Sequence, residues 1–102
     1  MKVLLCCGAG MSSGFLAQMT RSAAKKDGVT DLVCEAHPES TIGTMLQNFD
    51  IVCLGPHLAS ELKHVEEMCC PYGTKAIVIP AEIYSMLDGS ALYQLCKETV
   101  NK

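Results

Sequence analysis

Four short apolar runs divide the chain, and each gives way to a glycine or a proline. Most of them show no alternation of polar and apolar side chains, which is typical of parallel strands buried on both faces. The predicted strands are Val3–Cys7, Leu32–His37, Ile51–Leu54 and Ala76–Ile79. The pattern therefore predicts a parallel sheet that is covered on both sides.

The longest segment between these runs has the periodicity of an amphipathic helix, which we predict over Met11–Lys26. The side chains expected to face inward are Phe15, Leu16, Met19 and Ala23. Ser12 or Ser13 is expected to cap this helix. Two lysines in its last turn, followed by Gly28, are typical of a helix C-terminus.

Further helical segments complete the alternation with the strands. The pattern predicts a short helix over Thr41–Gln47, a long amphipathic helix that buries Leu58, Leu62, Val65 and Cys69, and a last helix from about Asp88, as N-cap, to Val100, with Leu92, Leu95 and Cys96 inward. Strand and helix alternate four times. We therefore expect residues 1–102 to form one α/β domain, a four-stranded parallel open sheet with helices on both faces.

Composition excludes several classes of protein. A net charge of −3 argues against a nucleic-acid-binding protein, which usually carries a basic face. No apolar stretch approaches the roughly 18 residues that a membrane span needs, and the first apolar run leads into glycines instead of a cleavage site. We expect a cytoplasmic protein with reduced thiols.

The seven cysteines contain no C-x-x-C pair, so the sequence predicts neither a zinc ribbon nor a thioredoxin-type redox pair, and no metal or cofactor. Three of them, Cys34, Cys53 and Cys96, stand in apolar segments and are expected to be buried. Cys6 is also expected in the core, because neighbouring side chains on a strand point to opposite faces.

Cys7 has a different setting, because it opens the run Cys7-Gly8-Ala9-Gly10-Met11-Ser12-Ser13-Gly14. Small residues let successive backbone N–H groups surround an anion, and the helix that follows presents its positive end. These two features are expected to lower the pKa of the Cys7 thiol and make it a nucleophile. The loop from Gly8 to Ser13 is therefore a candidate phosphate site, in which the two serines serve as caps, as ligands, or as both.

Three kinds of phosphate chemistry fit such a loop to different degrees. A Walker A loop is excluded, because no lysine lies within residues 8–14. A cysteine phosphatase needs an arginine six residues after the nucleophile, and Ser13 stands there; the only arginine, Arg21, is two helical turns away. A phosphoryl carrier is favoured, since it must hold phosphate without activating water. A small cysteine-dependent phosphatase and a non-catalytic module that binds phosphoproteins remain as alternatives.

In an open parallel sheet the ligand site lies outside the carboxyl ends of the strands. His37 and His57 stand at two of these ends, and both are candidates for the rim of the site by position alone. Tyr84, together with Asp88 and Gly89, either closes the site or shapes the last helix, and we favour a capping role for Asp88.

The chain resembles the enzyme IIB component of the bacterial sugar phosphotransferase system, of the lactose/cellobiose (N,N′-diacetylchitobiose) type. The resemblance rests on Cys7-x-Ala9-Gly10-Met11-Ser12-Ser13, Glu35-Ala36, Leu54-Gly55-Pro56 and Tyr84-x-x-x-Asp88-Gly89, in order along the whole chain. The chain departs from the family in four places: Cys6 puts a second thiol before Cys7, Gly8 and Gly14 stand where serine is common, and His57 where glutamine is common.

The resemblance implies a transferase with a phosphocysteine intermediate and a four-stranded parallel sheet flanked by helices. Cys7 would accept a phosphoryl group from a phosphohistidine on a IIA partner. It would pass this group to a sugar imported by the membrane permease IIC, with a β-linked disaccharide such as cellobiose, chitobiose or lactose as the expected sugar. The protein would then be cytoplasmic and associated with the membrane through IIC.

Overall fold

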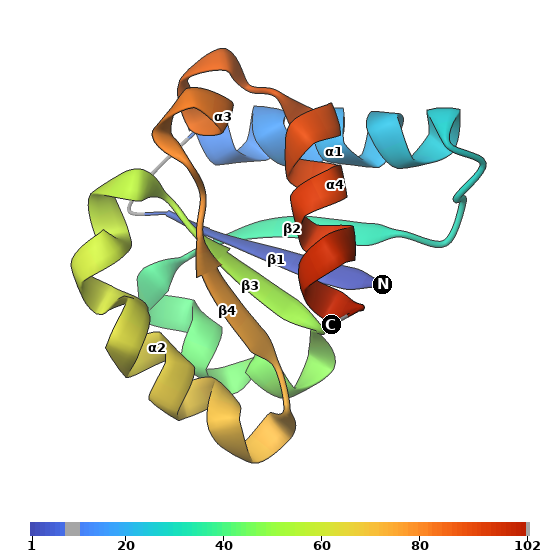
Figure 1. Cartoon of the computed structure of the whole chain (residues 1–102). Helices are drawn as coiled ribbons and strands as arrows, with labels where there is room; N and C mark the ends of the chain where they lie inside the picture. Colours follow the sequence, from blue (N-terminus) through green and yellow to red (C-terminus); the bar gives the residue numbers. More distant parts are fainter. Residues whose placement is uncertain (8–10, 102) are drawn as a thin grey trace.

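The computed structural model describes the backbone of residues 1–7 and 11–101, and all of their side chains except those of residues 7 and 11–13. Four parallel strands form one sheet in the order β2-β1-β3-β4 (Figure 1). Their bounds are β1 (Lys2–Cys7), β2 (Val33–Pro38), β3 (Ile51–Leu54) and β4 (Lys75–Val78). Each of the four predicted strands is confirmed within one residue at either end.

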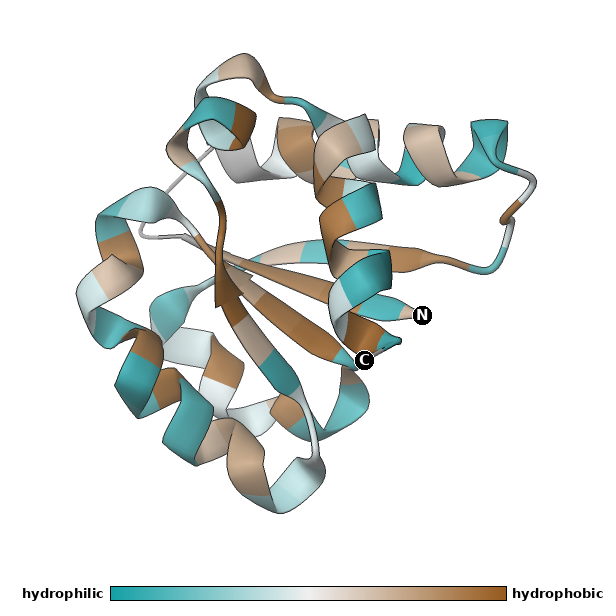
Figure 2. Ribbon diagram, in the orientation of Figure 1, coloured by the Kyte–Doolittle hydropathy of each residue, from teal (hydrophilic) through white to brown (hydrophobic). Residues whose placement is uncertain are grey.

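The two central strands are the most apolar part of the chain, as Figure 2 shows. Every residue of β3 is buried, and so are residues 3–6 of β1. This burial explains why neither strand alternates polar and apolar side chains, because both of their faces meet helices. Cys6 is 1% exposed, which confirms the expectation that it belongs to the core.

Helices cover both faces of the sheet (Figure 1). They are α1 (Met11–Lys26), α2 (Leu62–Cys69), α3 (Ala81–Met86) and α4 (Gly89–Val100), with 3-10 helices η1 (Glu39–Thr44), η2 (Leu46–Asn48), η3 (Pro56–Glu61) and η4 (Cys70–Tyr72). One core lies between the sheet and the pair α1 and α4, and a second lies between the sheet, α2 and the first two 3-10 helices. The predicted α/β fold with helices on both faces is confirmed.

The predicted inward face of α1 is wrong by about one residue. Phe15 and Met19 are 57% and 49% exposed, whereas the buried side chains of the helix are Leu16, Ala17, Thr20 and Ala24. Three of these four are small. They suit a helix that packs closely against both the sheet and another helix, where bulky residues would hold the backbones apart.

Three other helical segments differ from their predicted form. The segment at Thr41–Gln47 consists of two 3-10 helices, and the long second helix begins as a 3-10 helix and becomes α-helical only at Leu62. The short helix α3 was not predicted. The last helix agrees with its prediction: Asp88 is its N-cap, with a side-chain oxygen 3.1 Å from the amide nitrogen of Ala91. In this helix Tyr93 is buried and Leu95 is only partly so.

The ends of α1 are set by local backbone chemistry. Gly28 has a φ of +81°, which a glycine adopts without strain, and its amide donates to the carbonyl of Lys25 at 3.0 Å. At the other end the helix begins at Met11, so Ser12 and Ser13 lie inside its first turn. Both serines are thus helical residues, so the prediction that one of them is the N-cap is wrong.

The seam between α1 and α4 is unusually close at Gly89. A Cβ atom placed on this buried glycine would lie 2.3 Å from the carbonyl carbon of Met19 and 2.4 Å from the amide nitrogen of Thr20. At the far end of the seam, the Tyr93 hydroxyl donates to a carboxylate oxygen of Asp27 at 2.8 Å. Gly89 thus allows contact between the two helices, and the polar contact fixes their relative position.

Candidate functional site

The strand order makes the ends of β1 and β3 a topological switch point of the sheet. The chain leaves β1 for α1 on one face of the sheet, whereas it leaves the neighbouring β3 for η3 and α2 on the other face (Figure 1). Connections that diverge in this way leave a crevice between them at the carboxyl ends of the strands, which is the usual ligand site in such folds. Cys7 is the last residue of β1, so its backbone stands at this crevice.

A helix N-terminus follows Cys7 almost at once. Helix α1 begins at Met11 and is 16 residues long. Its first turn, which contains Ser12 and Ser13, has backbone N–H groups without acceptors inside the helix, and no acidic side chain. The positive end of the helix dipole therefore favours an anion near Cys7. The other predicted phosphate-binding residues, Gly8, Ala9 and Gly10, lie outside the described residues.

The end of β3 brings two of the predicted rim residues together. The amide of Gly55 donates to the carbonyl of Cys6 at 2.9 Å, which continues the pairing of β3 with β1 to the level of Cys7. Two residues later, the imidazole of His57 lies back over Gly55. The ring of Tyr84, on α3, approaches the imidazole edge-on, with the two ring centroids 6.2 Å apart.

Sequence reasoning missed the helix that presents Tyr84. Helix α3 follows Pro80 directly, and Glu82 lies in its first turn. A proline before the first turn and an acidic residue within it are ordinary signs of a helix start. The helix has only six residues, which is too short for an apolar periodicity to be recognised.

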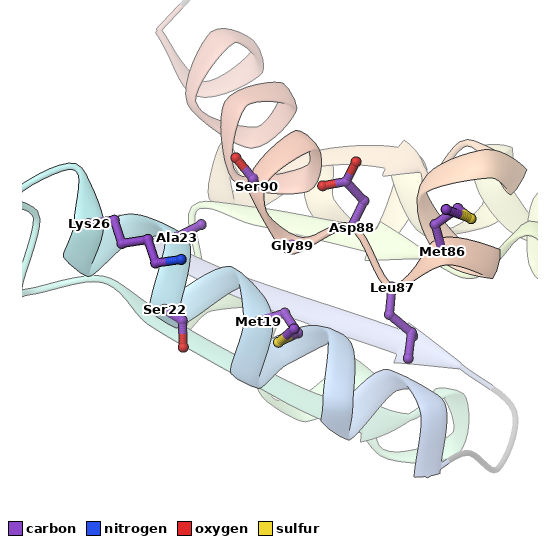
Figure 3. Close-up of a pocket in the computed structure, with 9 residues that line it drawn as sticks. All are labelled: Met19, Ser22, Ala23, Lys26, Met86, Leu87, Asp88, Gly89 and Ser90. Atoms are coloured by element: carbon purple, nitrogen blue, oxygen red, sulfur yellow. The ribbon is translucent and has the colours of Figure 1, made fainter.

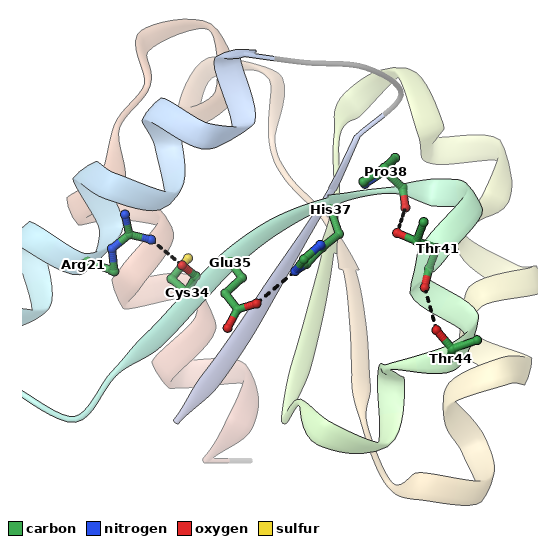
Figure 4. A network of polar contacts seen from close by, with 7 residues as sticks. All are labelled: Arg21, Cys34, Glu35, His37, Pro38, Thr41 and Thr44. Atoms are coloured by element: carbon green, nitrogen blue, oxygen red, sulfur yellow. Dashed lines mark hydrogen bonds and ion pairs between the residues drawn. The ribbon is translucent and has the colours of Figure 1, made fainter.

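His37, the third predicted rim residue, is directed along its own strand. Its Nε2 atom lies 2.9 Å from a carboxylate oxygen of Glu35, two residues earlier on the same face of β2 (Figure 4). Beyond the strand, the hydroxyl of Thr41 donates to the carbonyl of Pro38. The structure therefore places His37 in a polar pair on the outer strand and does not bring it into contact with Tyr84 or His57.

Arg21 is engaged away from the crevice. Its guanidinium donates to the backbone carbonyl of Cys34, on β2 (Figure 4). A cysteine phosphatase needs a guanidinium to hold the phosphoryl oxygens in the transition state. The only arginine of the chain is thus held at a carbonyl group, which weighs against hydrolysis.

The environment of the buried cysteines disfavours the thiolate, the form in which a cysteine acts as a nucleophile. Burial raises the pKa of the Cys34 thiol to about 12. The pKa of Cys53 is also raised, first by its contact with Cys96, whose sulfur lies 3.4 Å away, and then by burial. The thiols of Cys34 and Cys53 stay protonated at neutral pH, as expected for small buried side chains. Cys70, by contrast, is exposed at the end of α2.

A groove beside α1 is a separate feature. It has a volume of about 640 Å³ and lies between α1 and the segment that joins α3 to α4 (Figure 3). Its lining residues are Met19, Ser22, Ala23, Lys26, Met86, Leu87, Asp88, Gly89 and Ser90. None of these is a predicted phosphate ligand. Of the two that were considered for closing the site, Asp88 caps α4 and Gly89 lies against the backbone of α1.

The described part of the chain lacks two kinds of feature. No three side chains of the kinds that ligate metals come together there. None of the helices in this part is both long enough and apolar enough to cross a membrane.

Comparison with known proteins gives a matching family model and similar solved structures, among them two IIB proteins. Residues 2–95 match the family model described as "PTS system, Lactose/Cellobiose specific IIB subunit". The chain is 32% identical to the cellobiose-specific phosphotransferase IIB component of Borrelia burgdorferi, with a TM-score of 0.79 over 99% of this chain and 92% of that one. The lactose-specific IIB component domain from Streptococcus pneumoniae has a TM-score of 0.86 over 96% and 95% of the two chains; at 19% identity it supports the fold alone.

Proposed function

The chain belongs to the lactose/cellobiose-specific IIB family of the sugar phosphotransferase system, and from this premise we propose that Cys7 is its phosphoryl carrier. The family makes the protein a phosphotransferase component of sugar transport, in a system where IIB works with IIA and IIC components and a sugar. We take residues 1–102 as one IIB-type domain. The finer roles below are inferred from the positions of this chain's own residues.

The observation that carries the proposal is the position of Cys7. It ends the central strand β1 at the crevice, four residues before Met11, the first residue of α1. We propose that the backbone amides of residues 8–13 and the hydroxyls of Ser12 and Ser13 hold the phosphoryl oxygens. Together with the helix dipole, they would lower the pKa of the Cys7 thiol and supply the thiolate that the reaction needs.

Transfer then takes place in two displacements at phosphorus. The Cys7 thiolate attacks the phosphoryl group of a phosphohistidine on a IIA partner, the P–S bond forms, and the P–N bond breaks as the imidazole leaves with the electron pair. A sugar hydroxyl next attacks the phosphocysteine. Its O–P bond forms, the P–S bond breaks, the hydroxyl proton passes to water, and Cys7 is again a thiolate. The phosphocysteine carries about two negative charges, which the amides and the helix N-terminus stabilise between the two steps.

The absence of a free guanidinium at the crevice suits a carrier better than a hydrolase. Arg21 is bound to the Cys34 carbonyl, so neutral amides and hydroxyls would surround the phosphoryl group. Such a site stabilises the bound dianion without the bidentate clamp that phosphatases apply to the transition state. The phosphocysteine can then persist until the acceptor arrives.

The two displacements require a phosphoryl donor and an acceptor, and the family indicates their kinds. We propose that the donor is a IIA protein and that the acceptor is a β-linked disaccharide such as cellobiose, chitobiose or lactose, imported through a IIC permease. The protein would act in the cytoplasm, at the inner face of the membrane where IIC opens.

Replacing the thiol tests the proposal most directly. We expect the wild-type protein to gain the mass of one phosphoryl group after incubation with a phosphorylated IIA protein, and Cys7→Ser to gain none while it keeps the wild-type melting temperature. Cys70→Ser is the matched control, because it removes an exposed cysteine remote in sequence from the loop. Label on Cys7→Ser would refute the assignment. A wild type that takes no label but binds the phosphorylated partner would be a non-catalytic module, and turnover of a chromogenic phosphate ester would indicate a phosphatase.

A further inference from the structure

The imidazole of His57 lies on the backbone at the end of β3, next to the end of β1. A Cβ atom placed on Gly55 would lie 2.7 Å from Cε1 of His57 and 3.1 Å from its Nδ1. The ring therefore occupies the space where any other residue at position 55 would have its side chain. Gly55 itself donates to the carbonyl of Cys6, so its backbone and that of Cys7 are neighbours across one strand spacing, about 4.8 Å.

The ring also lies on the face of the sheet from which α1 begins. Along β3, Cys53 faces the α1 and α4 side and Leu54 faces the α2 side, so the Cβ position of Gly55 faces the α1 side again. Tyr84 packs against the same core, and its ring meets the imidazole at an interplanar angle of 68°. Although η3 leads away to the other face, the His57 ring returns to the crevice where Cys7 ends β1.

We propose that His57 is a phosphate-contacting residue, whose ring N–H donates a hydrogen bond to a phosphoryl oxygen held at Cys7. This inference rests on the proposed phosphoryl site at Cys7. An imidazole can donate from either ring nitrogen, and an N–H directed at a phosphoryl oxygen makes a charge-assisted hydrogen bond. Tyr84 holds the ring by its edge contact, and Gly55 provides the space for it.

The other two histidines provide an internal comparison. His37 is paired with Glu35 on the outer strand, and His64 is exposed on α2. His37 also stands near Cys7, because the next residue, Pro38, pairs with Cys7, but its ring is turned back along β2 to Glu35. His64 lies on a helix and not at a strand end. His64 is therefore a suitable control position, since the same substitutions there leave the crevice unchanged.

Two substitutions separate hydrogen bonding from packing. His57→Phe keeps a ring against Gly55 and Tyr84 but removes the N–H, whereas His57→Gln keeps an N–H donor but removes the ring. The probe is inorganic phosphate, titrated into ¹⁵N-labelled protein while the amide resonances of residues 11–14 and 55 are followed. We expect His57→Phe to bind phosphate about tenfold more weakly than the wild type, His57→Gln to stay within about twofold, and His64→Phe to match the wild type.

Several results would overturn the inference. It fails if the wild type binds no phosphate, if His57→Phe binds as tightly as the wild type, or if His57→Gln loses as much affinity as His57→Phe. The test does not depend on phosphoryl transfer. A protein that binds phosphate with the expected order of variants but never forms phosphocysteine would refute the carrier role and leave the His57 contact standing.

Discussion

Gly89 and Gly55 each allow another part of the chain to lie against their backbone, but the two contacts have different roles. At Gly89 the neighbour is the backbone of α1, whereas at Gly55 it is the far end of the His57 side chain. A backbone inside a packed core cannot move, but an exposed ring can turn away. The comparison teaches that a glycine can be required by the fold in one place and by the site in another, although both positions are buried.

Gly89→Ala is the substitution with the largest expected effect on stability. The added methyl would overlap the Met19–Thr20 peptide, so α1 and α4 would have to separate, at a cost of about 3 kcal/mol in the free energy of unfolding. Urea unfolding measures this loss. A variant as stable as the wild type would show that the seam can open without cost, and the contrast between the two glycines would disappear.

Gly55→Ala is expected to act on the site and leave the fold intact. The φ of Gly55 is −59°, which any residue adopts, so the free energy of unfolding should change by less than about 1 kcal/mol. The methyl would displace the His57 ring, and phosphate binding should weaken about tenfold, as for His57→Phe. The double variant Gly55→Ala/His57→Phe is the control, since it should be no weaker than either single variant. Additive losses would show that Gly55 acts independently of the ring.

The smallest effect is expected at the polar end of the α1–α4 seam. The hydrogen bond from Tyr93 and then the charge of Lys97 lower the pKa of Asp27, while the same hydrogen bond raises the pKa of Tyr93. A carboxylate with a lowered pKa stabilises the fold above its unfolded-state pKa, near 4, and this stabilisation is lost as the pH falls through the folded-state value.

We therefore expect Tyr93→Phe to have a slightly lower melting temperature than the wild type at pH 7. This difference in melting temperature should decrease as the pH is lowered through the range where Asp27 becomes protonated. Thermal melts across that range check this, with Tyr72→Phe, at an exposed tyrosine, as the control. A difference in melting temperature that does not change with pH would mean that the Asp27 carboxylate does not contribute to it.

The parts of the fold that could be predicted from the sequence are those with continuous or periodic patterns of apolar residues. The four strands and the bounds of α1 followed from apolar runs and from turn residues such as Gly28. The inward face of α1 did not, because Ala17, Thr20 and Ala24 contribute little to a hydrophobic pattern although they pack most closely. Hydrophobic periodicity is detected mainly from large apolar side chains, whereas the contact between α1 and α4 consists mostly of small ones.

The candidate site was predicted only in its local part. Cys7 and the small residues after it are contiguous, so their place between a strand and a helix could be inferred directly. The contact between His57 and Tyr84 brings η3 and α3 together. These segments are far apart in the sequence, and no sequence pattern relates them, so the contact could not be predicted. The pairing of His37 with Glu35 could have been predicted, because residues two apart on a strand lie on the same face of the sheet.

The order of strands in the sheet also has a consequence for the synthesis and folding of the chain. The central strand β1 is made first, and its two partners are β2, about 30 residues later, and β3, about 50 residues later. Parallel neighbours cannot form hairpins, so each pairing must close a long loop before it gains stability. The strand that carries Cys7 therefore leaves the ribosome with its apolar residues unpaired, and it can complete its hydrogen bonds only after β3, which ends at Leu54, has also been made.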